Sequence, residues 1–570
     1  MSAYAAIAKE ICKKWDVAFY SMYDDAALNE ALQVTTSTYL PDNLHPNAAG
    51  YDILTPYIAA FMQTMTAYEG SNYVAAKAAA LKADANTLDA VYFTAESYAA
   101  FQSAVAAAGE DPAALEAAAA LLAQAKEIPV SVAVKNLWYR AQKTFTVSNA
   151  EDLSALSTAV DHQLFATDAT ALQTVDLDLK EEPNLRIGVL APFAMTYDGQ
   201  NYTIRNMVIN DSADRTALFP MLSGTLKNFT VENAEVTANG WSAIVAGNTY
   251  GTESLIENVH VKNSTFNKTG TNNGIGIIVA QPRFNDGNFT LRNCTVSDSR
   301  INTAVDQVRI NVGFIASKTM ATACLIENCY AWGNTFSNNG SSYNSVGSII
   351  GESICGTIKD CGAYGNTFSG TFKNRGGILG VASTNSTTVQ DCYCPDEMIT
   401  ASASGFAEGC SYSEENCYTS CSTAMIENGK LAYILKASGD WVQKNMPMVA
   451  EGVESFAVTL ETEDETKVLY TNEKGNLIGE APEAIAWKLG ETLIPANELA
   501  TTVFEADVTL TAGYLSGDLN GNGIADTADA TLLMQYLVGY EVEFQSNADL
   551  NGDGNISIYD AVLLLRSLSV

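Results

Sequence analysis

The chain has 570 residues, and its 65 acidic side chains outnumber its 31 basic ones, which gives a net charge of −34 and a pI near 4.3. A chain of this length is too long to fold around a single hydrophobic core, so we expect several domains. The strong negative charge argues against partners such as nucleic acid or anionic membrane surfaces. No run of about 18 apolar residues occurs, so no membrane-spanning helix is expected.

Residues 1–68 are predicted to form a helix, a strand at VAFYSMYD, a loop and a second helix that begins at Ala48. The N-terminal stretch is charged at Lys9, Glu10 and Lys13 and lacks the apolar core of a signal peptide. Since other parts of the chain point to secretion, we expect its front end to be truncated.

The loop before the second helix reads PDNLHPNAAGYDIL and places Asp42 three residues before His45. This D-x-x-H-P-N arrangement resembles the last block of the SGNH (GDSL-type) hydrolases, which implies that Asp42 orients His45 and that His45 is a general base. The serine nucleophile and the oxyanion-hole residues of that family belong to upstream blocks that residues 1–41 do not contain. The candidate catalytic site is therefore incomplete. The alternative is a polar loop in which Asn47 caps the helix.

Residues 69–130 are rich in alanine with helical periodicity, which is interrupted at Gly70 and near Asp111-Pro112. The stretch YFTAESYAAFQSAVAAAG resembles the small helical FIVAR modules of secreted surface proteins. We expect a helical spacer without catalytic residues.

Residues 144–450 contain an internal repeat of 30 to 35 residues. Its anchor residues are Asn228, Asn258, Asn293, Asn328, Asp360 and Asp391. Apolar residues recur two positions before each anchor and one, three and eight positions after it. These columns run from Leu226 to Val389, from Phe229 to Cys392, from Val231 to Cys394 and from Val236 to Ile399.

Alternation after each anchor predicts a strand with one buried face, and the break at the anchor predicts a bend in which Asn adopts the left-handed conformation. Stacked coils of this kind form a parallel β-helix. The segments SAIVAG, GIIVAQ, VGFIAS, VGSIIG and GGILGV predict a second strand in each coil. The coils at residues 225–400 resemble GLUG-type β-helices, and FTVSNAEDLSALS resembles the lead-in segment of that family. This resemblance implies a secreted adhesive or carbohydrate-handling protein.

Cysteines fill one column of the repeat at Cys294, Cys329, Cys361 and Cys392. Adjacent coils stack roughly 4.8 Å apart, which is compatible with disulfides, but buried cysteines also pack as small apolar side chains. We favour thiols in the column. Cys410, Cys417 and Cys421, past the last coil, are better candidates for pairing.

Parallel β-helices also host polysaccharide lyases and galacturonases, which need clustered acids or a Lys or Arg base in a groove. We expect no catalytic constellation of paired acids across adjacent coils, and Arg283, Lys318 and Arg375 each occur in one coil alone. We interpret these three as solvated loop charges, and a lyase site is kept as an alternative.

Residues 453–513 alternate as strands around Ile485-Ala486-Trp487 and close with DVTLTAGY. The segment resembles the internalin-type β-grasp repeat, which implies a rigid spacer or adhesion unit.

The C-terminal region contains two related twelve-residue loops, DLNGNGIADTAD and DLNGDGNISIYD, each followed by an apolar helix. Oxygen ligands at positions 1, 3, 5, 7, 9 and 12 with glycine at position 6 are what a bound Ca²⁺ requires. The first loop offers Asp518, Asn520, Asn522, the Ile524 carbonyl, Asp526 and Asp529. The second loop offers Asp549, Asn551, Asp553, the Asn555 carbonyl, Ser557 and Asp560.

This pair of loops resembles a type I dockerin, which implies two bound Ca²⁺ ions and the cohesin domain of a scaffoldin as partner. The helix that precedes an EF-hand loop is missing, and position 12 is Asp instead of Glu. Thr527-Ala528 and Ile558-Tyr559 correspond to the positions at which dockerins choose their cohesin. Because these pairs differ between the repeats, symmetric two-way binding is not expected.

The predicted fold class is mainly β: a right-handed parallel β-helix with a flanking helical spacer, a small β-grasp repeat and an α-helical dockerin with two EF-hand-like calcium loops. The predicted protein is an extracellular, cellulosome-attached component of polysaccharide degradation, with an incomplete esterase site. Plant cell-wall polysaccharide is a candidate ligand of the β-helix. The alternatives are a non-catalytic cell-surface or adhesion protein and a β-helix polysaccharide lyase.

Overall fold

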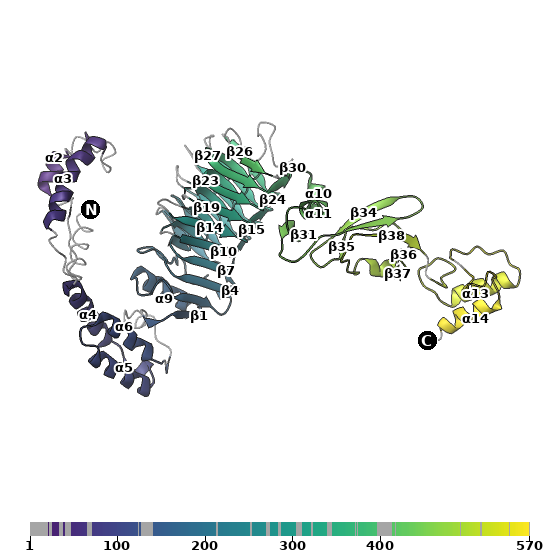
Figure 1. Cartoon of the computed structure of the whole chain (residues 1–570), viewed down its shortest axis with the longest axis horizontal. Coiled ribbons are helices and arrows are strands. Elements are labelled where there is room, and N and C mark those ends of the chain that lie inside the picture. The colour runs from purple at the N-terminus through teal and green to yellow at the C-terminus, as the bar shows by residue number, and fades with distance from the viewer. Residues whose placement is uncertain are drawn as a thin grey trace. The chain divides into compact units, whose positions relative to one another are not determined.

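The computed structural model describes most of the chain, and Figure 1 shows the order of its parts. The described residues are 21, 25–32, 38–39, 47–64, 71–123, 125–126 and 141–568, with gaps in the last range at 213–214, 251–252, 270–273, 283–286, 304–309, 321–322, 339–344, 371, 373, 396–412, 416–417, 491, 514–515 and 547. Backbone contacts divide the chain into two compact units, residues 1–146 with 151–171 and residues 147–150 with 172–570.

The first unit is helical. Its helices are α2 (Ala26–Ala31), α3 (Ala48–Thr64), α4 (Ser71–Ala85), α5 (Ala95–Ala107), α6 (Pro112–Ala118) and most of α9 (Ala150–Asp161), with 3-10 turns at Ala90–Tyr92 and Ala119–Leu121. Strands β1 (Thr144–Val147) and β2 (Thr170–Gln173) span the boundary between the units. Helix α3 begins at Ala48 as predicted, and Asn47 Oδ1 accepts a hydrogen bond from the Gly50 N–H at 2.9 Å.

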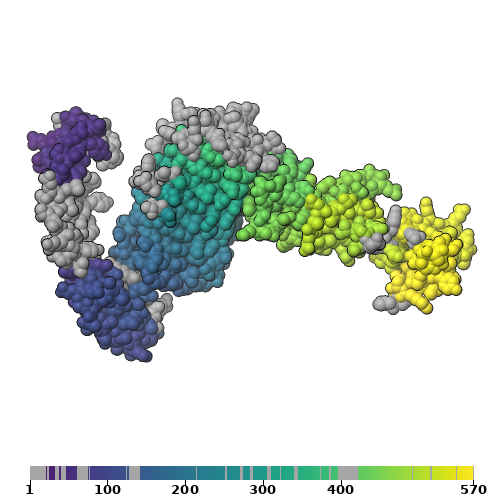
Figure 2. Space-filling model, in the orientation of Figure 1, coloured from purple at the N-terminus to yellow at the C-terminus, as the bar shows by residue number. Residues whose placement is uncertain are grey.

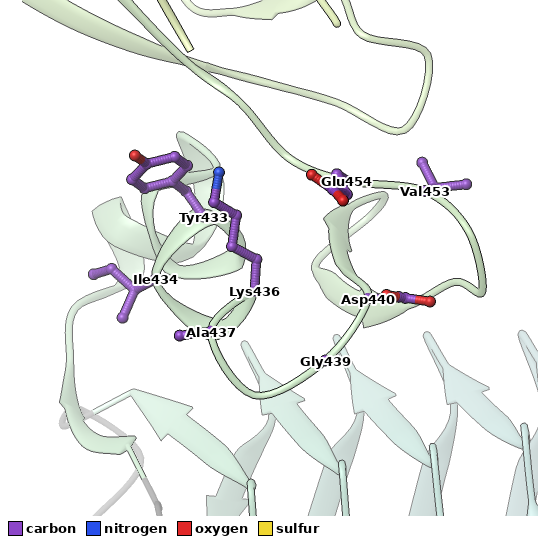
Figure 3. Close-up of a pocket in the computed structure, with 8 residues that line it drawn as sticks. All are labelled: Tyr433, Ile434, Lys436, Ala437, Gly439, Asp440, Val453 and Glu454. Carbon is purple, nitrogen blue, oxygen red and sulfur yellow. The ribbon is translucent and has the colours of Figure 1, made fainter. Parts of the chain in front are cut away.

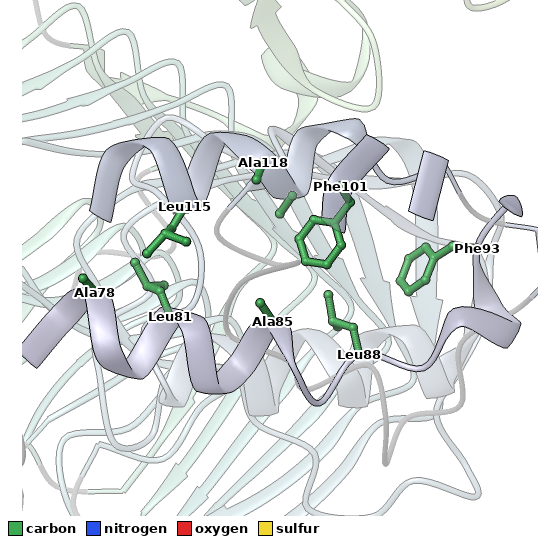
Figure 4. Packing of buried hydrophobic residues seen from close by; sticks show 9 residues of the cluster. Ala78, Leu81, Ala85, Leu88, Phe93, Phe101, Leu115 and Ala118 are labelled. Carbon is green, nitrogen blue, oxygen red and sulfur yellow. The ribbon is translucent and has the colours of Figure 1, made fainter. Parts of the chain in front are cut away.

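The predicted helical spacer is confirmed in helices α4, α5 and α6. Leu81, Phe101 and Leu115 are buried together between these helices (Figure 4). The break before α6 follows from its sequence, because Asp111 caps the helix and Pro112 occupies its first turn.

The second unit begins with stacked coils of parallel strands (Figure 1). The largest sheet includes β3 (Leu177–Asp178), β4 (Thr196–Arg205), β6 (Phe219–Leu222), β7 (Thr225–Glu232), β9 (Ala246–Thr249), β10 (Glu253–Lys262), β13 (Val279–Gln281), β14 (Asn288–Arg292), β15 (Thr295–Ser297), β18 (Ala316–Thr319), β19 (Ala323–Glu327), β20 (Tyr330–Trp332), β23 (Ile350–Lys359), β24 (Gly362–Tyr364), β27 (Leu379–Gln390), β28 (Tyr393–Pro395), β29 (Ser413–Glu415) and β30 (Tyr418–Cys421). A second sheet consists of β5 (Val208–Asp211), β8 (Glu235–Ala238), β11 (Thr265–Lys268), β16 (Arg300–Thr303), β21 (Thr335–Asn338) and β25 (Thr367–Ser369). A third consists of β12 (Ile275–Gly276), β17 (Asn311–Gly313), β22 (Ser345–Gly347) and β26 (Asn374–Gly376).

Strand register confirms the parallel β-helix and its columns. Ile256 is aligned with Leu226 on one side and with Leu291 on the other, and the column continues through the later coils to Val389. The column eight positions after the anchors is aligned from Val236 to Phe368. Its last predicted member, Ile399, lies outside the described residues. All six anchors have φ between 50° and 57°, so the left-handed bend is confirmed.

The prediction of two strands in each coil is wrong. The coil from Asn311 to Asn338 contains five strands, β17 to β21, because left-handed residues at Asn328 and Gly333 divide the segment that the sequence pattern treats as one strand. The parallel pairing also extends beyond the predicted coils, since β4 pairs with β7 and β28 pairs with β30. The turn in β4 contains left-handed Gln200 and Asn201 instead of a single anchor. The coil that contains β4 therefore does not match the sequence pattern of the repeat.

A partly exposed row of side chains alternates in charge along the coils. It consists of Asp198, Lys227, Glu257, Arg292, Glu327 and Lys359, which are neighbours in register. Three ion pairs form along it, at 3.2 Å for Lys227–Asp198, 2.7 Å for Arg292–Glu257 and 3.4 Å for Lys359–Glu327. Each pair contributes only about 0–1 kcal/mol at such exposure. Together these opposite charges favour the observed register.

The interpretation of Lys318 and Arg375 as solvated loop charges is wrong. The side chain of Lys318, on β18, is 13% exposed, and its Nζ lies 2.9 Å from the carboxylate of Glu352, which is 4% exposed. Asn311 Nδ2 and Ser383 Oγ also donate to this carboxylate. Arg375, on β26, packs over the ring of Phe368, and burial lowers its pKa. Strand pairing places Lys318 against the next coil, whereas Arg375 contacts Phe368 on β25, the strand directly before it in the chain. Arg283 lies outside the described residues.

The cysteine column consists of thiols, as predicted. Cys294, Cys329, Cys361 and Cys392 are fully buried, and each Sγ donates to the main-chain carbonyl two residues earlier at 3.1 to 3.3 Å. Of the cysteines expected to pair, Cys410 and Cys417 lie outside the described residues, and Cys421 Sγ donates to the Cys394 carbonyl at 3.2 Å.

A closing segment, residues 421–449, packs against the last coils. It contains α10 (Thr423–Glu427), α11 (Lys430–Leu435), β31 (Trp441–Gln443) and β32 (Pro447–Val449). Trp441 is fully buried, with its ring edge-on to the rings of Tyr330 and Tyr393. The Tyr393 hydroxyl donates to the Pro447 carbonyl at 2.6 Å, and the Val449 N–H donates to the Tyr330 hydroxyl at 2.9 Å.

Residues 457–513 form a six-stranded mixed sheet in the order β35-β34-β33-β38-β36-β37. Its elements are β33 (Ala457–Glu461), β34 (Thr466–Thr471), β35 (Leu477–Ile478), β36 (Ala486–Leu489), β37 (Thr492–Pro495), α12 (Ala496–Leu499) and β38 (Val508–Gly513). Ala486 and Trp487 are fully buried, as expected for the core of this segment, and Ile485 is half-buried.

The C-terminal module is yellow in Figure 2. It contains α13 (Thr527–Leu537) and α14 (Ile558–Ser567), labelled in Figure 1, and each helix follows one of the two related loops. Leu519, Leu533 and Leu564 are buried in its core. Both helices begin with a capping box, formed by Asp526 with Asp529 in α13 and by Ser557 with Asp560 in α14.

Candidate calcium and docking site

In the first loop, backbone donors hold the side-chain oxygens of the predicted ligands. Asp518 is fully buried, and its two carboxylate oxygens accept hydrogen bonds from the N–H groups of residues 521–523 at 2.8 to 3.1 Å. Asn520 Oδ1 accepts from the Asn522 N–H, and Asn522 Oδ1 accepts from the Ile524 N–H, both at 2.9 Å. Gly523, with φ of 87°, permits the turn at position 6.

The second loop repeats this geometry. Asp549 accepts from the N–H groups of residues 552–554 at 2.7 to 3.2 Å. Asn551 Oδ1 accepts from the Asp553 N–H, and Asp553 Oδ1 accepts from the Asn555 N–H, both at 2.9 Å. Two different sequences therefore fold into one loop conformation in which positions 1, 3 and 5 share the same hydrogen bonds.

The aspartates at position 12 have a structural role that the sequence pattern does not reveal. Asp529 Oδ1 accepts from the N–H groups of residues 519 and 520, and its Oδ2 accepts from the Asp526 N–H at 2.7 Å. Asp560 makes the matching bonds to residues 550, 551 and 557. Burial opposes the charge on Asp560, but these donors outweigh it and lower the pKa of its carboxyl. Position 12 therefore ties the start of each loop to the helix that follows.

The residues at position 9 also cap the helices. Asp526 Oδ1 accepts from the Ala528 N–H at 2.7 Å, and Ser557 Oγ accepts from the Tyr559 N–H at 3.2 Å. Among the described residues, no three His, Cys, Asp or Glu side chains gather closely enough to hold a metal ion by themselves. The predicted ligand sets also contain amide and main-chain oxygens, and hard oxygens of this mixture are what Ca²⁺ accepts. The donor chemistry of both loops thus fits a calcium ion.

The two helices present different surfaces at equivalent positions. Ile558, Tyr559 and Val562 on α14 are 52%, 71% and 40% exposed. The residues 31 positions earlier on α13 are Thr527, Ala528 and Thr531, which are also exposed. Helix α14 continues its apolar surface with Leu563 and Leu565, both at least 40% exposed. An exposed apolar patch of this kind marks an interaction surface.

A second candidate site is a groove of about 550 Å³ across four coils of the β-helix. Its lining residues include Thr290, Leu325, Thr357 and Thr388, which are aligned in one row on β14, β19, β23 and β27. Cys324 and Cys355 also line it. Burial raises the pKa of both thiols, so near neutral pH they are protonated and are poor nucleophiles.

A smaller groove of about 420 Å³ lies beside α11 and is shown in Figure 3. Two of its polar residues already have partners: the Tyr433 hydroxyl donates to Asp507 at 2.9 Å, and Lys436 Nζ donates to the Ser455 carbonyl at 3.1 Å. Lys436 also lies 4.2 Å from the centre of the Tyr433 ring. These contacts join the closing segment to the neighbouring sheet, which is a structural role.

Asp42 and His45 lie outside the described residues, so their predicted geometry stays a prediction. The Asn47 cap of α3 agrees with the alternative interpretation of this segment as a polar loop before a helix. Among the described helices, none has both the length and the apolar character needed to span a bilayer.

The architecture and the paired loops define a modular β-helix protein with a C-terminal calcium-loop module. Residues 516–569 match the family described as "Dockerin type I domain", and this segment is a type I dockerin. The dockerin implies a cohesin domain as partner, and domains of this family generally bind Ca²⁺.

No curated protein matches the chain. A solved structure described as a putative immunoglobulin A1 protease from Bacteroides ovatus is similar at 19% identity and a TM-score of 0.39, covering 54% of this chain and 91% of that one. A likeness at this level says nothing about activity.

Proposed function

We propose that the protein is an extracellular cellulosome-type component of polysaccharide degradation that docks through Ca²⁺-dependent binding of its dockerin to a cohesin. The observation that carries the proposal is the duplicated loop in which Asp518 and Asp549 hold the same backbone bonds, within a segment that is a type I dockerin. Each loop takes one Ca²⁺ ion in this proposal. The oxygen sets from Asp518 to Asp529 and from Asp549 to Asp560 supply the ligands.

Binding of the full chain to a panel of type I cohesin domains, in CaCl₂ and in excess EGTA, tests this proposal. We expect binding to at least one cohesin in Ca²⁺ and none in EGTA. Absence of binding to every cohesin in Ca²⁺ would contradict the proposed partner class.

Helix α14 is proposed to lead the contact with cohesin. Its Tyr559 and Val562 offer exposed apolar area at the two positions where α13 has Ala528 and Thr531, although α13 exposes Met534 and Tyr536 further along. The Tyr559→Ala/Val562→Thr variant should lose about 30-fold or more in affinity, as expected when anchors of an interface are truncated. The matched change on α13, Thr527→Ala/Thr531→Ala, should leave affinity within a few-fold of the parent. Equal losses in the two variants would show that both helices are used.

The β-helix groove supports a second candidate function, binding of a neutral polysaccharide chain. Threonine hydroxyls and the Leu325 side chain match the mixed polar and apolar surface of a sugar ring, and both thiols in the groove are uncharged. A glycan array probed with the full chain tests it. Thr357→Tyr should abolish any binding by filling the groove, whereas Thr225→Tyr, in the same row but outside the groove, should not. No binding to any plant or bacterial polysaccharide would refute this role.

An esterase role for Asp42 and His45 rests on the D-x-x-H-P-N motif alone. Hydrolysis of acetylated polysaccharide by this chain, and by a form that carries any upstream coding sequence, tests it. Activity that survives His45→Ala would remove the proposed base.

A further inference from the structure

The anchor side chains of the β-helix form a ladder of hydrogen bonds with a direction. Asn228 Nδ2 donates to Asp198 Oδ1 at 3.0 Å, and Asn258 Nδ2 donates to Asn228 Oδ1 at 3.0 Å. Further along, Asn328 Nδ2 donates to Asn293 Oδ1 at 3.2 Å. In each of these bonds the later coil donates and the earlier coil accepts. Asp198, a carboxylate that only accepts, suits the start of the ladder.

The next two rungs, Asp360 and Asp391, cannot continue the ladder while they are ionised. Both keep the left-handed backbone, with φ of 53° and 50°, and both follow residues that are in register with the preceding coils. An ionised carboxylate has no proton to donate. Correspondingly, Asn328 Oδ1 is a buried acceptor without a hydrogen-bond partner in the described part of the chain. A buried acceptor left in this state destabilises the fold.

We propose that Asp360 holds a proton in the folded protein and donates it to Asn328 Oδ1. A carboxylic O–H then takes the place of the amide N–H that Asn228, Asn258 and Asn328 supply in their coils. Asp360 is 9% exposed, and Asp391, on the next coil, is 4% exposed. Among the described residues, Asp391 Oδ1 also has no hydrogen-bond partner. The ladder therefore runs through this pair of acids only if at least one of them is protonated.

The surrounding charges are compatible with this proton. Lys359 Nζ lies 3.1 Å from Asp360 Oδ2 and 3.4 Å from Glu327 Oε1, so Glu327 still balances the lysine when Asp360 is neutral. Burial raises the pKa of Asp360, and Asp391 and Glu327 act in the same direction against the opposing effect of Lys359. Nearby Tyr330, Cys361 and Cys392 have pKa values raised by burial and are neutral.

A raised pKa in the folded state makes stability depend on pH in a defined sense. The contribution of Asp360 is fully present below its unfolded pKa of about 3.9 and is lost as pH rises through its higher folded pKa. Above the unfolded pKa the chain must take up a proton as it folds to form this bond, whereas asparagine donates at every pH without a proton being taken up. Asp360→Asn should therefore stabilise the β-helix near neutral pH, and the gain should disappear in acid.

The test compares thermal unfolding of the β-helix in the full-length parent and in Asp360→Asn at pH 7 and near pH 4. At pH 7 we expect the variant to unfold about 2–4 °C higher, with a smaller difference at the lower pH. Asparagine occupies four of the six anchors, so the variant should fold. The control is Glu253→Gln on β10, an exposed site with the same change in charge, which should show no such gain. A gain that is absent at pH 7, or equal at both pH values, would overturn the proposal.

The same unfolding measurement, repeated with CaCl₂ and with EGTA, distinguishes a proton on Asp360 or Asp391 from a metal ion bound between them. Both proteins carry the same dockerin, so its response to CaCl₂ and EGTA cancels in the comparison. If Ca²⁺ raised the β-helix transition of the parent and not that of Asp360→Asn, a cation would hold the pair, and the proposal would be wrong.

Discussion

At the scale of the residue, the left-handed anchors follow directly from the sequence, because only asparagine, aspartate and glycine readily adopt that backbone. The surroundings of single polar residues do not follow from it. Lys318 and Glu352 are 34 residues apart, and only the pairing of β18 with β23 brings them together. His260 gives no signal in the sequence either, yet its ring lies between Thr295 Oγ1 and Asn258 Oδ1, at 2.8 and 3.0 Å.

His260 should make the stability of the β-helix sensitive to mild acid. Burial lowers its pKa, so the stability it contributes is present above the unfolded pKa of about 6.5 and is lost as pH falls through the lower folded pKa. From pH 7 to pH 5 the parent should lose more free energy of unfolding than His260→Gln, as measured by urea denaturation. His162→Gln, at an exposed site in the turn directly after α9, is the control and should follow the parent. Equal pH slopes for the parent and His260→Gln would contradict this prediction.

At the scale of the element, apolar columns predict the strands that repeat, and they miss the elements that occur once. The columns that begin at Leu226 and Val236 are aligned ladders, because the equivalent residues of successive coils pack in the same environment. The closing segment has no such repetition. Tyr330 and Tyr393 follow their anchors like the equivalent residues of other coils, and nothing local shows that Trp441 covers them. In the dockerin the loop ligands could be predicted from spacing, whereas the bridging bonds of Asp529 and Asp560 could not.

The closing segment should contribute strongly to stability through Trp441. Removal of this fully buried ring in Trp441→Ala should cost about 3–5 kcal/mol in the free energy of unfolding, since the cavity leaves two tyrosine rings without their partner. Urea denaturation followed by circular dichroism measures this. Val503→Ala, at a site that is 57% exposed, should change stability by less than about 0.5 kcal/mol. A similar small effect in both variants would show that the segment is only loosely attached.

At the scale of the whole molecule, composition predicted several domains, and the repeat and the paired loops identified the two with the strongest patterns. The number of strands in each coil and the outer limits of the β-helix could not be predicted, because the turn at Gln200 and Asn201 departs from the anchor pattern. The expectation of several domains has a direct consequence for metal removal.

Chelation of Ca²⁺ should unfold the dockerin and leave the β-helix intact. Formation of each loop and binding of its ion are coupled, so excess EGTA should abolish the helical signal of residues 516–570 together with cohesin binding. The strand signal of the coils and their thermal transition should not change, because their cores contain none of the predicted ligands. Circular dichroism and cohesin binding before and after EGTA measure both parts. Cohesin affinity that persists in excess chelator would refute the coupling.

Because its coils are regular, the β-helix can become longer or shorter by one complete coil at a time. Among the described residues, strand pairing joins each coil to the coils directly before and after it, about 30 residues away, and the bond from Asn258 to Asn201 reaches one coil further, so these contacts do not depend on the total number of coils. Duplication or loss of one repeat would lengthen or shorten the body by roughly 4.8 Å without a new fold. Loss of a few residues within a coil would instead misalign every column. A gene that encodes such a body can therefore vary, by unequal recombination between repeats, how far the dockerin stands from the rest of the chain.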